Sequence, residues 1–247
     1  PLLLVAAIVL WIIFGGPKLP PGTDAIIDDV LRSELPELIT GRTGYAQSEG
    51  RDIWYESIPP AGPVRGTVLL LIGMGGDGFL WPLGIDSAHL VGLSMGGMIA
   101  QEIAIHHPQR VASLTLMMTT GHAGDPELPG PSSRFFINNA AAGLPLLKYR
   151  LMGGEKNLIK ERVAKMAGAL GLEGIDVRET AERVLYDLRR RRGINGRAVF
   201  QHWTAVNVSG SRYEGLKDVA ASALVIHGTD DHLLPIEHGR KLATTIP

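Results

Sequence analysis

Residues 88–97 read Ala-His-Leu-Val-Gly-Leu-Ser-Met-Gly-Gly, and this stretch decides the fold. Its first four residues, Ala88 to Val91, make a short and mostly apolar run, as expected of a strand buried in a parallel sheet. A helical pattern, Met95 to His106, follows at once. The intervening Gly92 to Gly96 fits the G-x-S-x-G pattern, which places a serine on a strained strand-to-helix turn. Ser94 is therefore the candidate nucleophile.

The groups around Ser94 predict a site that stabilises an oxyanion. Side chains two residues before or after Ser94 would collide with neighbouring backbone, which explains the glycines. The start of a helix favours developing negative charge, so we expect the Met95 N–H to be one oxyanion donor. A glycine-rich segment, Ile72 to Gly76, ends an earlier apolar run. We predict that the Met74 N–H there is the second donor; the alternative is a simple loop.

Further apolar runs extend the strand pattern along the chain. Because helical stretches alternate with these runs, the sequence predicts an α/β fold with a mostly parallel sheet. Gly44–Ser48 and Asp52–Ile58 flank Glu49-Gly50 and predict a hairpin. The runs assigned to the parallel sheet, besides Ala88–Val91, are Thr67–Ile72, Val111–Met118 and Ala223–Ile226.

The segment His227 to Pro235, with sequence HGTDDHLLP, follows the last apolar run. A carboxylate placed there could orient a catalytic histidine. Asp231 is the better candidate of the two adjacent aspartates, and Asp230 is then a turn residue.

Together GLSMGG and VIHGTDDHLLP make the chain resemble the α/β-hydrolase superfamily, especially its cofactor-free serine esterases, methylesterases and haloperoxidase-like members. The resemblance covers most of Gly44 to Pro247. It implies that Ser94 attacks a small-molecule ester, that Asp231 is the acid, and that an acyl-enzyme is hydrolysed without cofactor or metal. Perhydrolases and carbon–carbon bond hydrolases share the motif, and a non-catalytic binding protein is a further alternative. Serine rather than aspartate at this turn argues against dehalogenases and epoxide hydrolases.

Two departures from this family pattern affect the expected activity. The family's catalytic histidine follows one more strand, whereas only 16 residues follow Asp231. No histidine in the chain fits the role by position, although His122 follows a strand and could approach the site. Only 13 residues separate Gly73 from Ser87, where the family has helices and a further strand. We therefore expect an incomplete copy of a hydrolase, nearly inactive as written.

The N-terminal residues Leu2 to Phe14 are uninterruptedly apolar. As a helix they span about 20 Å, less than the ~30 Å of a bilayer core. The chain starts without Met, so we interpret the segment as a truncated single-pass membrane anchor whose orientation the sequence does not define. A cleaved signal is the main alternative, but residues 15–21 lack the small-x-small cleavage pattern.

Helical patterns dominate residues 135–213, which we interpret as a helical cap inserted between two sheet strands. Such a cap can act as a lid over an active site, or serve only as a packing layer. The cations Arg189 to Arg192 suit a helix C-terminus better than a phosphate or membrane site. The expected organisation is an anchor (1–16), a linker with a short helix (17–43), hydrolase core (44–134), cap (135–213) and hydrolase core (214–247).

Overall composition excludes several classes of function. The 247 residues carry 24 Lys and Arg against 25 Asp and Glu, a formal charge of −1, which gives no electrostatic reason to bind nucleic acid. The absence of cysteine removes disulfides, thiolate metal sites and cysteine nucleophiles. With 45% hydrophobic residues the chain has enough apolar sequence for a folded domain.

Overall fold

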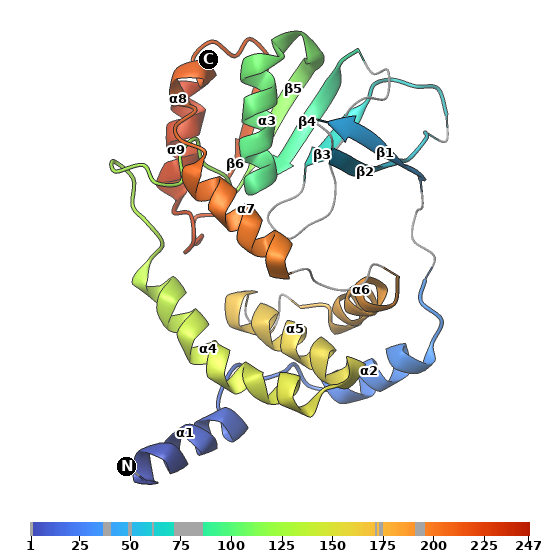
Figure 1. The fold of residues 1–247 in the computed structure, drawn as a ribbon, viewed down its shortest axis with the longest axis vertical. Coiled ribbons are helices and arrows are strands. Elements are labelled where there is room, and N and C mark those ends of the chain that lie inside the picture. Colours follow the sequence, from blue (N-terminus) through green and yellow to red (C-terminus); the bar gives the residue numbers. More distant parts are fainter. Residues whose placement is uncertain are drawn as a thin grey trace. The chain divides into compact units, whose positions relative to one another are not determined.

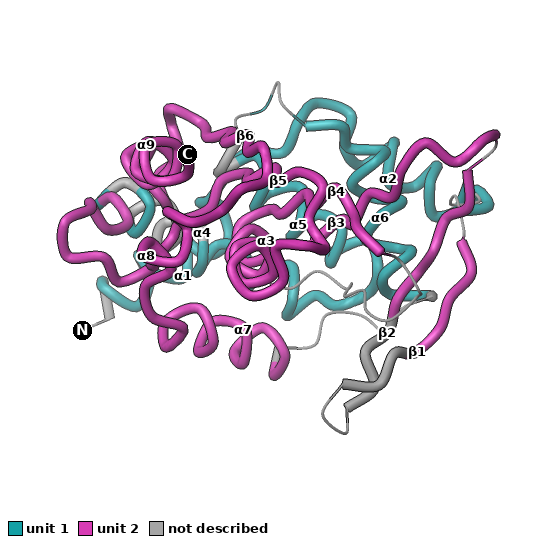
Figure 2. Tube along the Cα trace, turned by 90° about the horizontal axis from the view of Figure 1, so that it is seen from above, with its two compact units in different colours: residues 1–38, 133–194 teal, residues 39–132, 195–247 magenta. Residues whose placement is uncertain are grey.

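The computed structural model describes residues 2–36, 41–48, 51–60, 62–71, 86–170, 172, 175–190 and 196–247. The chain forms two compact units, each made of two stretches of sequence (Figure 2). The first unit comprises Pro1–Leu38 and Ser133–Ile194. The second comprises Ile39–Ser132 and Asn195–Pro247, and it carries all the β-strands of the described residues.

The second unit contains a four-stranded parallel sheet (Figure 1). Its strand order is β3-β4-β5-β6, so the predicted parallel sheet is confirmed. The strands are β3 (Val68–Leu71), β4 (Ala88–Leu93), β5 (Val111–Met117) and β6 (Ala223–Ile226). The predicted hairpin is also present, as the antiparallel pair β1 (Arg42–Ser48) and β2 (Arg51–Ser57).

The carboxyl ends of three neighbouring strands lie level with one another. Leu93 at the end of β4 pairs with Met117 of β5, and Met117 pairs with Ile226 of β6. The segments that follow these strands, which begin at Ser94 and His227 for β4 and β6, therefore leave from one edge of the sheet. Ligands of open α/β sheets bind at this edge.

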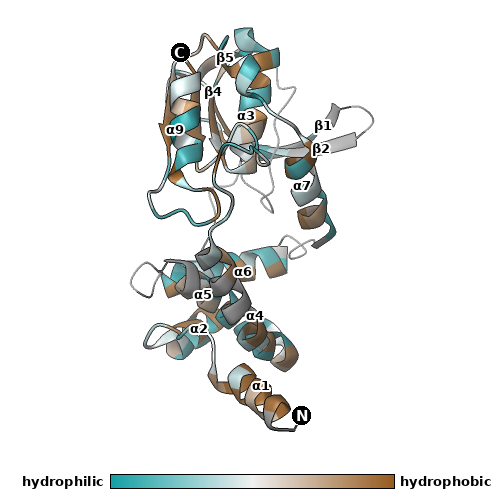
Figure 3. Cartoon of the chain, turned by 90° about the vertical axis from the view of Figure 1, so that its left-hand side faces the viewer, coloured by the Kyte–Doolittle hydropathy of each residue, from teal (hydrophilic) through white to brown (hydrophobic). Residues whose placement is uncertain are grey.

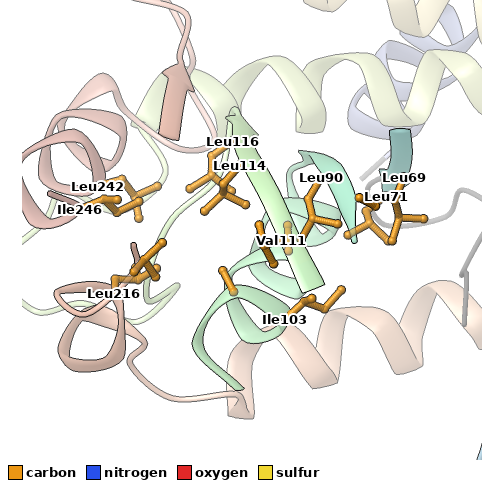
Figure 4. Packing of buried hydrophobic residues seen from close by; sticks show 14 of the residues in the cluster. Leu69, Leu71, Leu90, Ile103, Val111, Leu114, Leu116, Leu216, Leu242 and Ile246 are labelled. Atoms are coloured by element: carbon orange, nitrogen blue, oxygen red, sulfur yellow. The ribbon is translucent and has the colours of Figure 1, made fainter. Parts of the chain in front are cut away.

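Helices cover one face of the sheet and form the main core with it (Figure 4). They are α3 (Met95–His106), α8 (Tyr213–Leu216) and α9 (Ile236–Thr245). Side chains alternate between the two faces of a strand, so every second residue points into this core. The fully buried leucines of the cluster are Leu90, Leu114, Leu116, Leu216 and Leu242. The 3₁₀ turn η1 (Pro108–Arg110) and helix α7 (Gly196–Val208) complete the described elements of the unit.

The opposite face of the sheet carries exposed aliphatic side chains. Val68 and Leu70 of β3 are 57% and 61% exposed, and Leu224 and Ile226 of β6 are 55% and 44% exposed. Their neighbours Leu69 and Leu71 are buried, as the alternation requires. Parallel sheets are normally covered on both faces, so the exposure of these four side chains departs from the usual arrangement in the described residues of this unit.

The first unit is entirely helical in its described residues. Its helices are α1 (Leu2–Phe14), α2 (Thr23–Arg32), α4 (Ser133–Met152), α5 (Gly154–Leu170) and α6 (Val177–Arg190). The helices α2, α5 and α6 share a second core of Ile27, Val30, Ile159, Val163, Val177, Ala181 and Leu185. Helix α2 is amphipathic, and its apolar stripe faces this core.

Ion pairs surround the core of the first unit. Lys156 Nζ lies 3.3 Å from Asp24 Oδ1 and 2.5 Å from Asp28 Oδ1. Glu161 is 8% exposed and lies 3.0 Å from Arg150 Nε. Burial raises the pKa of Glu161, but hydrogen bonds from Arg150 and Lys165 outweigh this effect and hold the pKa below its usual value. These contacts link α5 to α2, which is distant in sequence, and to α4, which precedes it directly.

The N-terminal helix corrects the membrane prediction. Helix α1 is apolar along its whole length (Figure 3), but it ends after 13 residues, at Phe14, before Gly15, Gly16 and Pro17. Within the described ranges, no helix is both long enough and apolar enough to cross a membrane. The predicted single-pass anchor at Leu2–Phe14, and the membrane localisation based on it, are therefore wrong.

The predicted helical cap is divided between the two units. Residues 135–213 contain α4, α5 and α6 of the first unit and α7 of the second. Helix α4 forms although it contains Pro145, a residue that usually disfavours a helix interior. Arg189 near the end of α6 pairs with Glu155 at 2.6 Å, so part of the predicted cation run has a local partner. A lid function for the cap and the domain boundaries given above remain predictions.

Candidate active site

Ser94 occupies the sharp turn that the motif predicts. Strand β4 ends at Leu93 and helix α3 begins at Met95, so a single residue connects them. Ser94 has φ 53° and ψ −119°, a conformation that is strained for any residue with a side chain. Its backbone N–H donates to Met117 O at 2.9 Å, and its own carbonyl accepts from Gly97 N at 2.9 Å. The turn is thus held from both sides despite its strain.

The glycines at the turn are required by close backbone contacts. A Cβ on Gly92 would lie 2.5 Å from Gly96 O and 2.6 Å from Gly97 Cα. A Cβ on Gly97 would lie 2.7 Å from Thr119 Cβ. Real Cβ atoms do not approach backbone this closely, so the first helical turn of α3 can approach β4 only because Gly92 lacks a side chain. This geometry matches the steric reason for the G-x-S-x-G spacing.

Met95, the predicted first oxyanion donor, lies at the start of helix α3. It is the first residue of α3, and the N–H of a first helical residue has no carbonyl partner inside its own helix. The partial positive charge of the helix N-terminus adds to this N–H. Met74, the predicted second donor, lies outside the described residues.

Asp231 lies in a turn after β6 that fixes one of its carboxylate oxygens. Asp231 Oδ1 accepts hydrogen bonds from Leu233 N and Leu234 N, both at 2.9 Å. Its side chain is 17% exposed, whereas the neighbouring Asp230 is an exposed residue. These bonds leave Asp231 Oδ2 available to a partner, in keeping with the choice of Asp231 over Asp230 as the candidate acid.

His227 is a contact of this turn that the sequence reasoning missed. It directly follows β6, and its Nε2 lies 2.7 Å from Leu234 O and 3.6 Å from Asp231 Oδ2. The side chain is 3% exposed. The available signal was the four-residue spacing between His227 and Asp231 in the sequence.

His238 is another buried histidine near the acid segment. Its Nδ1 lies 2.8 Å from Thr120 Oγ1 and its Nε2 lies 3.0 Å from Pro129 O. The side chain therefore fastens α9 to the segment that follows β5. His238 is 2% exposed, and its position in the sequence did not indicate this burial.

A charged cluster strengthens the same attachment. Lys241 Nζ of α9 lies 2.7 Å from Asp125 Oδ2 and 2.8 Å from Glu127 Oε2. Burial raises the pKa of Asp125, but the hydrogen bonds from Lys241 and from Glu127 N lower it by more. The pKa of Asp125 is therefore below its usual value. Hydrogen bonds to the carboxylates of Asp125 and Glu127 raise the pKa of Lys241. Opposite charges that favour each other's ionised form explain both shifts.

The expected base is not identified by these contacts. Across the part of the chain that the structure describes, Ser94 Oγ makes no hydrogen bond to a histidine. His122 follows β5, between the strands that lead to Ser94 and Asp231, and its N–H donates to Thr120 Oγ1 at 3.1 Å. His89 contacts a different serine, Ser113, at 2.8 Å. Searching the described residues also finds no group of three or more histidines and carboxylates that could hold a metal ion.

Comparison with known proteins identifies relatives of the chain. The family model described as alpha/beta hydrolase fold matches residues 79–247. A 2-hydroxy-6-oxononadienedioate/2-hydroxy-6-oxononatrienedioate hydrolase of Paraburkholderia phymatum is 32% identical over 171 residues, which are 69% of this chain and 55% of that protein. A 2-hydroxymuconate semialdehyde hydrolase of Pseudomonas sp. (strain CF600) is 28% identical over 170 residues, which are 68% of this chain and 54% of that protein. The chain thus spans about half the length of these curated relatives.

A solved structure supports the same fold. The crystal structure of a hydrolase from Pseudomonas aeruginosa PA01 has a TM-score of 0.53 to this chain and 19% sequence identity. The match covers 83% of this chain and 87% of the other. At this identity the likeness concerns the fold alone.

Proposed function

Because this chain belongs to the α/β-hydrolase family, we propose that it is a serine hydrolase that cleaves a carbon–carbon bond beside a keto group. The observation that carries the proposal is the strained Ser94 turn between β4 and α3, with φ 53° and an N–H of a helix N-terminus beside it. A binding protein has no need for a strained, half-exposed serine at the carboxyl edge of a sheet.

The substrate class follows the names of the relatives. The relatives compared above are hydrolases of 2-hydroxy-6-oxo-dienedioates and of a hydroxymuconate semialdehyde. These names favour carbon–carbon bond hydrolysis, which was the alternative to ester hydrolysis in the sequence analysis. Membrane attachment is not part of the proposal.

In the proposed reaction, Ser94 Oγ forms a bond to the keto carbon of the substrate and the Met95 N–H stabilises the resulting oxyanion. The carbon–carbon bond then breaks, and the leaving carbon takes a proton. Water hydrolyses the acyl ester on Ser94 and releases a carboxylic acid. Asp231 orients the histidine that moves the protons. Slow turnover by residues 1–247 on their own stays a prediction.

The nucleophile is tested with a reactive fluorophosphonate on a form of the protein that turns over substrate, followed by mass spectrometry of the adduct. The adduct is expected on Ser94, and the Ser94→Ala variant should lose it. Ser113→Ala is the matched control, because Ser113 lies 2.8 Å from the imidazole of His89 but is within strand β5 rather than at the strained turn. Loss of labelling in Ser113→Ala, or equal labelling of Ser94→Ala and the unmodified chain, would overturn the assignment.

The substrate class is tested by comparing kcat/KM for a 2-hydroxy-6-oxo-dienoate and for p-nitrophenyl acetate. The proposal expects the higher value for the keto compound. A higher kcat/KM for the ester would instead indicate ester hydrolysis. Loss of that activity in Ser94→Ala would show that Ser94 is still the nucleophile.

A further inference from the structure

The imidazole of His227 is buried between the acid turn and helix α9. A Cβ on Gly239 of α9 would lie 2.7 Å from His227 Cβ, so the helix backbone lies directly against the ring. His227 Nε2 faces Leu234 O at 2.7 Å. Within the described residues, its Nδ1 is buried and has no hydrogen-bond partner.

These surroundings assign the proton on the ring. A carbonyl oxygen can only accept, so Nε2 must carry the hydrogen that Leu234 O receives. The buried Nδ1 then holds a lone pair, since a second N–H there would be left without an acceptor. His227 is therefore a neutral donor that points its N–H towards the acid turn.

The N–H of His227 acts on both ends of the turn that contains Asp231. It is bonded to Leu234 O, and its Nε2 lies 3.6 Å from Asp231 Oδ2, beyond hydrogen-bond distance but close enough for a favourable charge–dipole contact. Leu233 N and Leu234 N hold Asp231 Oδ1 from the other side. The positions of both carboxylate oxygens thus depend on Leu234. Its N–H binds Asp231 Oδ1, and its carbonyl holds the His227 N–H near Asp231 Oδ2.

We propose that His227 is a positioning residue, whose Nε2–H locks the 231–234 turn so that Asp231 Oδ2 points in a fixed direction. This inference rests on the proposed function for the role of Asp231 as the catalytic acid. His227 does not touch the reacting atoms; it holds the group that orients the base, much as outer hydrogen bonds orient functional ligands.

The test measures hydrogen exchange of the Leu233 and Leu234 amides by NMR in three variants. His227→Phe keeps a ring of similar size and removes the N–H, so exchange of the two amides should quicken about tenfold or more, beyond any change in the core amide of Leu114. His227→Gln offers a side-chain N–H near the position of Nε2 and should restore exchange to within about threefold. His238→Phe is the matched control, because the His238 imidazole is also buried but lies against Thr120 Oγ1 and Pro129 O, outside the 231–234 turn.

Three results would overturn the proposal. They are equal quickening at Leu233, Leu234 and Leu114 in His227→Phe, failure of Gln to restore protection, or selective quickening in His238→Phe. If His227→Phe does not fold, the imidazole ¹⁵N chemical shifts of His227 in the unmodified protein provide the test instead. A protonated Nδ1 with an unprotonated Nε2 would contradict the proposed hydrogen-bond donor. Ser94 labelling is a separate measurement. Its failure alone would remove the catalytic role of Asp231 and leave the lock intact.

Discussion

Thr119 Oγ1 donates a hydrogen bond of 2.7 Å to the carbonyl oxygen of Ser94. Thr119 is completely buried and lies in the loop after β5. The strained turn after β4 is therefore held by a residue that follows the neighbouring strand. The Thr119 side chain occupies the space that a Cβ on Gly97 would need. The hydrogen bond from Thr119 to Ser94 therefore requires a glycine at position 97.

Thr119→Val should remove this hydrogen bond while keeping the shape of the side chain. The Ser94 carbonyl keeps two backbone donors, Gly97 N and Met98 N, so we expect a moderate loss of about 1–2 kcal/mol in the free energy of unfolding. Urea unfolding measures this loss, and Thr119→Ser, which keeps the hydroxyl, is the control. If the valine and serine variants were equally stable, the hydroxyl would have no role in bracing the turn.

Asp231→Asn is expected to lower kcat by about 10³-fold or more in a form of the protein that turns over substrate. The reason is that an amide cannot stabilise the histidine in the required tautomer as a carboxylate does. Asp230→Asn is the matched control, since Asp230 is adjacent and exposed, and it should change kcat less than about threefold. Steady-state kinetics decide, and similar losses at both positions would contradict the choice of Asp231.

Acid should weaken the attachment of α9 through Asp125. The pKa of Asp125 is lower in the folded chain than its unfolded value of about 3.9. Its ionised form therefore stabilises the fold fully above that unfolded value, and this contribution is lost as the pH falls through the lower folded pKa. Asp125→Asn should reduce stability at pH 7 and flatten the decline in Tm below pH 4.

Thermal unfolding between pH 7 and pH 2.5 measures this effect. Asp218→Asn is the control, because Asp218 is exposed in the same unit. If Tm fell as steeply below pH 4 in Asp125→Asn as in the unmodified chain, the Asp125–Lys241 pair would not contribute to the pH dependence of stability.

His122→Ala should change kcat/KM by less than about threefold. His122 leaves the same edge of the sheet as Ser94, but its described contact is a backbone hydrogen bond to Thr120, and the family order places the base after the acid. Steady-state kinetics on the preferred substrate measure the change. A loss of about 100-fold or more, with Tm unchanged, would instead identify His122 as the base.

Sequence patterns predicted those parts of the structure that are determined by residues close together in the chain. The turn at Ser94 follows from glycines within three residues of it, so its strand–turn–helix context could be inferred. The partners of His238 lie 118 and 109 residues away, and no spacing in the sequence could indicate its burial. Helix α4 forms across Pro145 because packing can override the local preference of a single residue. The apolar run Leu2–Phe14 forms helix α1, but among the described residues no helix is long and apolar enough to cross a membrane.

The exposed sheet face formed by Val68, Leu70, Leu224 and Ile226 affects how the stability of this chain should be compared with that of its relatives. Both the heat capacity of unfolding and the dependence of stability on denaturant scale with the surface that becomes newly exposed. Side chains that already meet water in the folded state add little to either quantity. A given urea midpoint therefore corresponds to a smaller free energy here than in a protein of equal length whose sheet is covered on both faces.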